Sequence, residues 1–281
     1  MRQLYLCALS NIKSGSCKED CRFCTQSSKW KAKIDRYKWK SFHEIEEEMA
    51  EAKRWGATGF CLVTSGKGPD SEEVERLGEI IFGLKKSFPD LKLIGCFGVA
   101  TREMLQFWKE NGLEAYNHNL ESSREFYPNL CTTHRWEERF ACCEAVKSVG
   151  LQLYSGGIFG VGEKESDWHS LFSSLRLLQP EVIPINFFIP NPALPLHPTH
   201  SPEMGLKLIG LARSYFPEAV IMMAGGRELL FGKEWWRGIE AGANGIIIGN
   251  YLTTTGDSPA SDWEIIEKRR YRVFGREGRR G

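Results

Sequence analysis

The chain has 281 residues, of which 42% are hydrophobic and 26% are charged, a composition typical of a globular protein with a sizeable core. Its formal net charge of +1 excludes a strong overall field toward nucleic acid or an anionic membrane, so we expect neither as a partner. No apolar run reaches the roughly 18 residues that a membrane-spanning helix needs.

Short apolar segments typical of strands alternate with amphipathic segments typical of helices along the whole chain. The first helix is expected at residues 41–56, where Ser41 and Glu44 have the spacing of a capping box. Further helices are expected at residues 100–112 and 201–217. The eight expected strands are residues 4–10, 58–64, 91–97, 114–120, 151–157, 182–188, 219–225 and 244–250.

Eight strands separated by helices predict parallel βα units, and the length of the chain predicts their closure into a single (β/α)8 barrel of the TIM type. A doubly wound open sheet is the alternative. No linker rich in Pro, Gly or Ser divides the chain, so we expect one barrel over residues 1–260 and a C-terminal helix with a basic tail over residues 261–281. Catalytic groups of such barrels lie at the carboxyl ends of the strands, which predicts one large site there.

Three of the nine cysteines, Cys17, Cys21 and Cys24, lie in one polar loop after the first expected strand. An odd number of cysteines with three so close together does not suit a disulfide framework, so we expect reduced thiols and a cytoplasmic protein. A structural zinc site uses four protein ligands. Three thiolates instead suit a [4Fe-4S] cluster that leaves one iron open to a non-protein ligand. A zinc-stabilised binding protein without catalytic activity is the alternative from another class.

The C-x3-C-x2-C spacing, with Phe23 before the last thiol, resembles the radical S-adenosylmethionine (radical SAM) superfamily. Within it, the chain resembles the biotin synthase family in segments that follow in order: SGSCKEDCRFCTQSS, YNHNLESS, SGGIFGVGE, PINFF, AGGRE and YLTTTG. The resemblance implies radical insertion of sulfur into dethiobiotin to give biotin. It also implies S-adenosylmethionine, a [4Fe-4S] cluster and, as sulfur donor, an auxiliary iron–sulfur cluster of the [2Fe-2S] type. A mutase or maturation-type radical SAM enzyme without sulfur insertion is the second hypothesis.

The resemblance also implies the residues of the site. The implied catalytic residues are Cys17, Cys21, Cys24 and Arg227. The residues implied to bind S-adenosylmethionine are Phe23, Thr64, Ser65, Gly66, Asn119 and Glu121. Those implied to bind dethiobiotin are Asn117, Asn119, Asn186, Thr253 and Thr254. Asparagine amides suit this substrate because a ureido ring presents both N–H donors and a carbonyl acceptor.

For the auxiliary cluster the implied ligands are Cys61, Cys96 and Arg227. A guanidinium is charged and has no lone pair to donate, so Arg227 taken alone predicts an ion pair with a carboxylate. Tyr154 stands where the family has a further cysteine ligand. Three hypotheses follow: a tyrosinate ligand, a cluster of another type with fewer protein ligands, or radical chemistry without sulfur insertion. A tyrosine on a barrel strand, taken alone, predicts a side chain that fills the lumen.

Other cysteines offer substitutes for the missing ligand. Cys142 and Cys143 lie on an expected helix and are expected to pack as small hydrophobic residues, whereas Cys131 lies in a loop and stays a candidate. Cys7, within the first strand, is expected in the core. The resemblance further implies a homodimer and an electron-donor protein of the flavodoxin or ferredoxin type.

Overall fold

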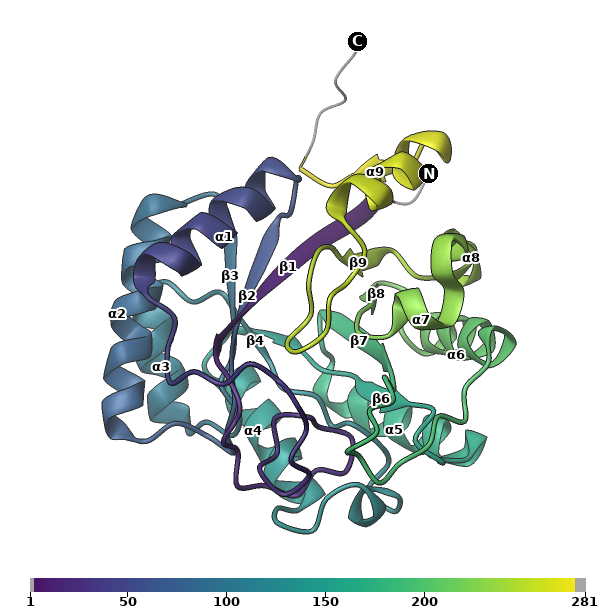
Figure 1. Cartoon of the computed structure of the whole chain (residues 1–281), viewed down its shortest axis with the longest axis horizontal. Helices are drawn as coiled ribbons and strands as arrows, with labels where there is room; N and C mark the ends of the chain where they lie inside the picture. The colour runs from purple at the N-terminus through teal and green to yellow at the C-terminus, as the bar shows by residue number, and fades with distance from the viewer. Residues whose placement is uncertain (1–2, 276–281) are drawn as a thin grey trace.

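The structure is a computed structural model that describes residues 3–275 (Figure 1). Parallel strands close into a barrel with the helices around its outside, and the pairing of β9 with β1 completes the circle. This confirms the (β/α)8 barrel and excludes an open sheet. The barrel strands in order are β1 (Gln3–Lys13), β2 (Gly59–Thr64), β3 (Lys92–Cys96), β4 (Ala115–Asn117), β5 (Gln152–Tyr154), β7 (Val182–Phe187), β8 (Val220–Met223) and β9 (Gly245–Ile247).

The fifth position of the barrel is split, where one strand over residues 151–157 is expected. β5 meets β7 only at Tyr154, and a separate strand, β6 (Gly157–Phe159), pairs with the later part of β7. Pro184 of β7 has no N–H to donate to the ladder at this point. The backbones also approach closely, since a Cβ on Gly156 would lie 1.9 Å from the Pro184 carbonyl oxygen. The break therefore follows from Pro184 and Gly156.

The three helices with bounds expected from sequence are present. α1 (Phe42–Arg54) begins with the capping box of Ser41 and Glu44. α3 (Arg102–Glu110) and α6 (Pro202–Tyr215) match the other two within a few residues. The remaining α-helices are α2 (Ser71–Ser87), α4 (Trp136–Ser148), α5 (Glu165–Leu178), α7 (Arg227–Phe231), α8 (Trp236–Ala241) and α9 (Pro259–Lys268), with 3-10 turns η1 (Tyr127–Asn129) and η2 (Gly232–Glu234). No helix within residues 3–275 is both long and apolar enough to cross a membrane.

Two hydrophobic clusters divide the strand side chains between the two faces of the barrel. The outer cluster joins the strands to the helices and includes Leu4, Leu6 and Ala8 of β1. A smaller cluster fills the lumen; its members, here called the lumen cluster, are Cys7, Cys61, Val63, Ile94, Ala115, Tyr154, Val182, Met222, Ala224 and Ile247. Alternation along each strand thus sends one set of side chains outward and the other into the barrel.

The C-terminal segment packs back onto the barrel. An ion pair between Asp262 of α9 and Arg227 of α7 joins these two helices. β10 (Arg272–Val273) pairs with the first residues of β1. The expected division at residue 260 stays a prediction. Residues 276–281, which belong to the expected basic tail, lie outside the described part of the chain.

Candidate active site

A cavity of about 400 Å³ opens among the carboxyl ends of the strands. Most residues of the lumen cluster line the part of the cavity inside the barrel. The loops after β1, β7 and β9 line the part beyond the strand ends. The site residues predicted from sequence that line it are Phe23, Cys24, Cys61, Cys96, Asn117, Asn119, Glu121, Tyr154, Asn186, Thr253 and Thr254. The predicted residues that are not part of its lining are Cys17, Cys21, Thr64, Ser65, Gly66 and Arg227.

The three-cysteine loop turns sharply where β1 ends. Gly15 and Ser16 both have positive φ, +76° and +57°, a left-handed conformation that glycine adopts readily. Gln26 fixes the turn, because its side-chain oxygen accepts from Gly15 N at 2.7 Å and its carbonyl accepts from Cys17 N at 3.2 Å. The loop thus folds back on itself and brings Cys24 to the cavity.

The three thiols of this loop lie close enough to affect one another's ionisation. Burial raises the pKa of Cys24 to about 11, and the nearby Cys17 adds to the effect. A hydrogen bond with Cys131 and then burial raise the pKa of Cys21, with Cys24 contributing. These thiols are neutral in the absence of metal, and a bound cation would drive their deprotonation.

The segment after β2 supports this loop instead of lining the cavity. Ser65 Oγ donates to the Gly15 carbonyl at 2.7 Å. The backbone of Gly66 is hydrogen-bonded to the Cys17 thiol, which partly offsets the effect of burial on its pKa. Thr64, the last residue of β2, leads into this contact.

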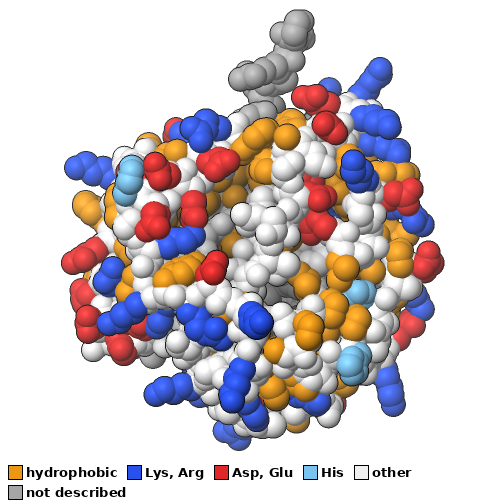
Figure 2. Space-filling view, viewed as in Figure 1, with side chains coloured by type: hydrophobic (Ala, Val, Ile, Leu, Met, Phe, Trp, Pro, Cys, Tyr) orange, Lys and Arg blue, Asp and Glu red, His pale blue; other side chains and the backbone are white. Residues whose placement is uncertain are grey.

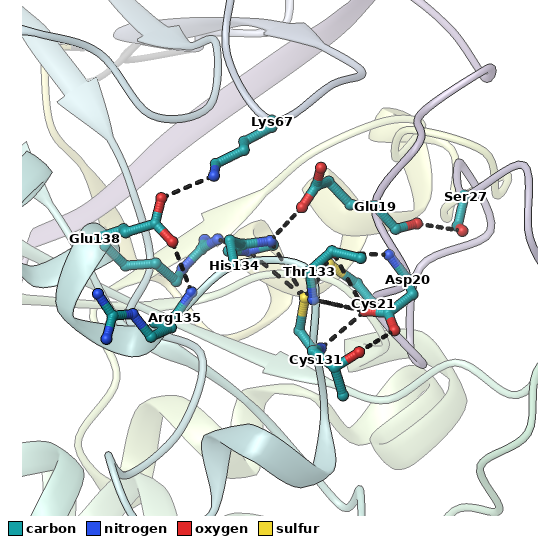
Figure 3. A network of polar contacts seen from close by, with 12 residues as sticks. Glu19, Asp20, Cys21, Ser27, Lys67, Cys131, Thr133, His134, Arg135 and Glu138 are labelled. Atoms are coloured by element: carbon teal, nitrogen blue, oxygen red, sulfur yellow. Dashed lines mark hydrogen bonds and ion pairs between the residues drawn. The ribbon is translucent and has the colours of Figure 1, made fainter.

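Asp20 anchors the three-cysteine loop to the loop before α4 (Figure 3). Its carboxylate accepts from Thr132 N at 2.8 Å, from Thr132 Oγ1 at 2.5 Å and from Thr133 Oγ1 at 3.2 Å. Although burial opposes ionisation, these hydrogen bonds lower the pKa of Asp20 overall. A second tie joins Arg22 N to the Leu130 carbonyl at 2.8 Å.

Cys131 lies beside Cys21 in the same network, with 3.6 Å between the sulfur atoms (Figure 3). Its sulfur is 3.2 Å from Nδ1 of His134, which is 2.6 Å from a carboxylate oxygen of Glu19. The hydrogen bond from Cys21, followed by that from His134, lowers the pKa of Cys131 to about 4. Ligand atoms of Cys21, Cys131 and His134 lie within 4.8 Å of one another. Cys131 therefore adjoins the three-cysteine loop and belongs to the outer cluster, whereas Cys61 belongs to the lumen cluster.

A second thiol group lies in the lumen. The thiols of Cys61 on β2 and Cys96 on β3 share a hydrogen bond, which raises the pKa of Cys61 and lowers that of Cys96. Asn117 Nδ2 donates to the Cys96 sulfur at 3.6 Å. Tyr154 packs in the same cluster, and burial, followed by the nearby Cys7 and Cys61, raises the pKa of its hydroxyl. Its phenol is therefore neutral and fills lumen volume.

Of the three predicted asparagines, Asn117 keeps an open polar atom. Its side-chain oxygen is buried and has no hydrogen-bond partner within residues 3–275. By contrast, Asn119 Oδ1 accepts from Gly156 N at 3.1 Å. Asn186 uses both ends of its amide, donating to the Gly157 carbonyl at 3.2 Å and accepting from Gly225 N at 3.1 Å. A buried acceptor without a partner is costly, so Asn117 suits a ligand with an N–H donor.

Glu121 reaches the cavity from a left-handed backbone position with φ of +69°. Burial raises its pKa, while Arg139 at 3.2 Å opposes that effect. Arg139 comes from α4 and also donates to the Asn119 carbonyl at 2.6 Å. Arg139 thus fixes the loop after β4 at Asn119 and Glu121, the two residues of this loop that are predicted to bind S-adenosylmethionine.

Arg227 is completely buried next to the cavity and is held by a carboxylate. Its two terminal nitrogens donate to the two oxygens of Asp262 on α9 at 2.9 and 3.1 Å, and one also donates to Glu228 at 2.8 Å. These contacts give Arg227 the ion-pair role that its own chemistry predicts. A place among the auxiliary-cluster ligands would require the loss of a proton from this paired guanidinium, and it stays a prediction.

The loop between β9 and α9, residues 251–256 and here called the strap (Figure 1), contributes Tyr251, Leu252, Thr253 and Thr254 to the cavity lining. Thr253 Oγ1 is 2.8 Å from Thr25 Oγ1 in the three-cysteine loop. Tyr251 donates from its hydroxyl to Glu228, the neighbour of Arg227, at 2.9 Å. Thr253, Thr254 and Tyr251 line the cavity, so the strap couples the Arg227 ion pair to the mouth of the site.

Two family models match successive parts of the chain. Residues 11–175 match the model of the radical SAM superfamily, and residues 184–272 match the Biotin and Thiamin Synthesis associated domain. The chain is 52% identical over 266 residues to the biotin synthase of Nautilia profundicola, covering 95% of this chain and 96% of the relative. The chain belongs to the biotin synthase family. It is also 45% identical over 278 residues to the biotin synthase of Wolinella succinogenes, covering 99% and 98% of the two chains.

Solved structures support the fold. Methylornithine synthase superposes with a TM-score of 0.84 at 20% identity, covering 96% of this chain and 83% of its own. The FeFe-hydrogenase maturase of Carboxydothermus hydrogenoformans gives 0.83 at 16% identity, with 96% and 67% covered. At such identities the likeness concerns the barrel alone.

Sequence reasoning missed several residues of the site. Cys7 lines the cavity, although it was expected only as a core residue. Arg139 and Asp262 hold predicted site residues from distant helices, and no local sequence pattern marks either of them. No local pattern marks Cys7 as a lumen residue either, because both faces of a barrel strand are apolar.

Proposed function

We propose that this chain catalyses the radical insertion of sulfur into dethiobiotin, giving biotin. The observation that carries the proposal is that two separate thiol groups serve one cavity. One group, in the loop after β1, reaches the cavity through Cys24, and the other is the pair Cys61 and Cys96 on the lumen wall. Membership of the biotin synthase family supports the reaction and the substrate.

Cys17, Cys21 and Cys24 would hold the [4Fe-4S] cluster. They fit it because all three thiols are free, lie in one folded-back loop and provide three ligands, leaving one iron for a non-protein ligand. When bound, this cluster supplies the electron that cleaves S-adenosylmethionine and provides a carbon radical able to remove hydrogen from unactivated carbon. Phe23, Asn119 and Glu121, which line the cavity, are the proposed contacts of S-adenosylmethionine.

Asn117 would recognise the ureido group of dethiobiotin. Its unpartnered Oδ1 can accept an N–H of the substrate, while its Nδ2 is already used by Cys96. This arrangement holds the ureido ring beside the second thiol group, where sulfur is to be inserted. Thr253 and Thr254 on the strap are the proposed partners of the substrate carboxylate.

The second thiol group would hold the auxiliary cluster as sulfur donor. Cys61 and Cys96 fit an iron–sulfur centre because their thiols are already in contact and face the cavity. The [2Fe-2S] type and the participation of Arg227 are parts of the proposal that rest on the resemblance. Tyr154 departs from the cysteine that the family has at its position, so the resemblance does not support it as a ligand.

The electron donor is proposed to be an acidic redox protein of the flavodoxin or ferredoxin type. The loop after β1 exposes Lys18, Lys29, Lys31, Lys33, Arg36 and Lys38. Figure 2 shows Lys and Arg side chains gathered on the lower part of the viewed face, over the region where Figure 1 draws this loop. Such a basic surface beside Cys17, Cys21 and Cys24 attracts a negatively charged partner and speeds its association.

Two further parts of the proposal concern the cell and the assembly. None of the nine cysteines is in a disulfide, which supports a reducing, cytoplasmic compartment. A homodimer follows from the resemblance and is tested by light scattering during size-exclusion chromatography.

The test is an anaerobic reaction of the reconstituted protein with dethiobiotin, S-adenosylmethionine and a reductant, followed by mass spectrometry of biotin and 5′-deoxyadenosine. The proposal expects both products, and it expects neither from Cys24→Ala. Formation of 5′-deoxyadenosine without biotin in the wild type would favour a radical SAM enzyme of the mutase or maturation type. Absence of iron together with bound zinc would favour the non-catalytic alternative.

A further inference from the structure

Cys7 of β1 presents a third thiol to the lumen, beside Cys61 and Cys96. It belongs to the lumen cluster and lines the same cavity. Its side chain is buried, with 6% exposure. The pattern of the biotin synthase family, as it stands in this chain, gives Cys7 no role.

The register of the strands places the three thiols on adjacent strands of one wall. Cys7 pairs with Gly59, Leu9 with Cys61, and Val63 with Cys96. The thiols therefore occupy β1, β2 and β3 in turn, each two residues further along its strand. All three point inward, because residues two apart share a face of a strand.

Cys7 forms part of the floor of the cavity. Cys7 and Tyr154 also line a second cavity, which opens among the amino ends of the strands and includes Tyr5, Lys92 and Gln152 in its lining. Cys7, Tyr154, Val182 and Met222 line both cavities and therefore form the partition between them.

Gly59, the residue that pairs with Cys7 on the adjacent strand β2, leaves room for the Cys7 sulfur. A Cβ on Gly59 would lie 2.9 Å from the Cys7 sulfur, so a side chain at this position would push the thiol away. Glycine inside a strand weakens it, and its use here marks a close approach.

The other residues that could replace the missing family cysteine are less suited. Tyr154 carries a phenol, whose ordinary pKa of about 10 lies above the roughly 8.5 of a thiol, so a metal removes its proton less readily. Cys131 adjoins Cys21. Cys142 and Cys143 belong to the outer cluster, between α4 and the strands, where the Cys143 thiol donates to the His118 carbonyl at 3.1 Å.

We propose that Cys7 is a thiolate ligand of the auxiliary iron–sulfur cluster, together with Cys61 and Cys96. The inference rests on the proposed function, which requires that cluster. On binding, the Cys7 sulfur loses its proton to solvent and forms a bond to iron, with no change in the oxidation state of the sulfur. Cys7 thus supplies the thiolate that Tyr154 does not.

The experiment compares wild type with Cys7→Ala, Tyr154→Phe and Cys142→Ala after anaerobic reconstitution with ⁵⁷Fe and sulfide. Cys142→Ala is the control for removal of a buried thiol outside the lumen. Iron and sulfide per chain and Mössbauer spectra report the clusters, and cleavage of S-adenosylmethionine reports the first thiol group separately. We expect Cys7→Ala to lose the iron and sulfide of the second cluster and to keep four irons and cleavage. Tyr154→Phe and Cys142→Ala should keep both clusters.

A second cluster in Cys7→Ala with the wild-type spectrum would overturn the role of Cys7 and leave the proposed function standing. A wild type that holds only the four-iron cluster would overturn the proposed function, and the role of Cys7 with it. If Cys7→Ala does not fold, Cys7→Ser, which keeps nearly the same volume, takes its place. An altered or missing second-cluster spectrum in Cys7→Ser supports the proposal, and an unchanged one overturns it.

Discussion

The ion pair between Arg227 and Asp262 gives the sharpest prediction about stability. Both side chains are completely buried, and they form two hydrogen bonds, of 2.9 and 3.1 Å. Asp262→Asn keeps the shape of the side chain but removes its charge. Removing one partner of a buried pair costs about 3–5 kcal/mol, because the other charge is left without compensation. Glu228, at 2.8 Å from Arg227, supplies part of that compensation, so we expect about 3 kcal/mol.

Differential scanning calorimetry of the anaerobic protein measures this effect. For a chain of this size about 3 kcal/mol corresponds to a fall in Tm of roughly 6–12 °C. Glu264→Gln, on the exposed side of the same helix, is the matched control and should stay within about 0.5 kcal/mol of wild type. A change below about 1 kcal/mol for Asp262→Asn would show that this ion pair does not stabilise the fold as expected. It would mean that Arg227 has another partner in solution, as the auxiliary-cluster role implies.

Three further predictions concern single side chains. Asn117→Ala should lower kcat/KM for dethiobiotin about 5- to 150-fold in steady-state assays, since an unpaired buried N–H costs roughly 1–3 kcal/mol; an unchanged value would remove Asn117 from the ureido contact. Burial holds the pKa of His118 well below its usual value, so below about pH 6.5 the unfolded chain takes up a proton that the folded chain refuses. Wild type should therefore lose up to about 1.4 kcal/mol per pH unit relative to His118→Phe between pH 6.5 and 5.5, measured by urea unfolding, and parallel pH profiles would contradict this. Ser41→Ala should lower the free energy of unfolding by about 1 kcal/mol in the same assay, because α1 loses its N-terminal cap. An unchanged free energy would mean that the capping box does not stabilise the protein.

The fold followed from the sequence because the strands and helices alternate along nearly the whole chain. The capping box at Ser41 and the three-cysteine loop depend on local spacing, which a sequence displays directly. The split of the fifth strand was not predictable from its own residues, because it depends on Pro184 in the neighbouring strand.

Long-range partners account for most of what the sequence could not reveal about the site. Asp262 is 35 positions from Arg227, and Cys131 is 110 positions from Cys21. The lumen position of Cys7 was hidden for another reason. Strands covered on both faces are apolar throughout, so periodicity does not say which residues face the lumen. Only the register with β2 and β9 fixes the direction of this side chain.

We propose that sulfur held in the lumen of this barrel becomes the sulfur of biotin. The most direct measurement reconstitutes the wild-type protein with ³⁴S-sulfide, removes free sulfide, and analyses by mass spectrometry the biotin formed in a single turnover. We expect biotin that carries ³⁴S. Biotin with sulfur of natural isotopic abundance, or no biotin alongside 5′-deoxyadenosine, would contradict it.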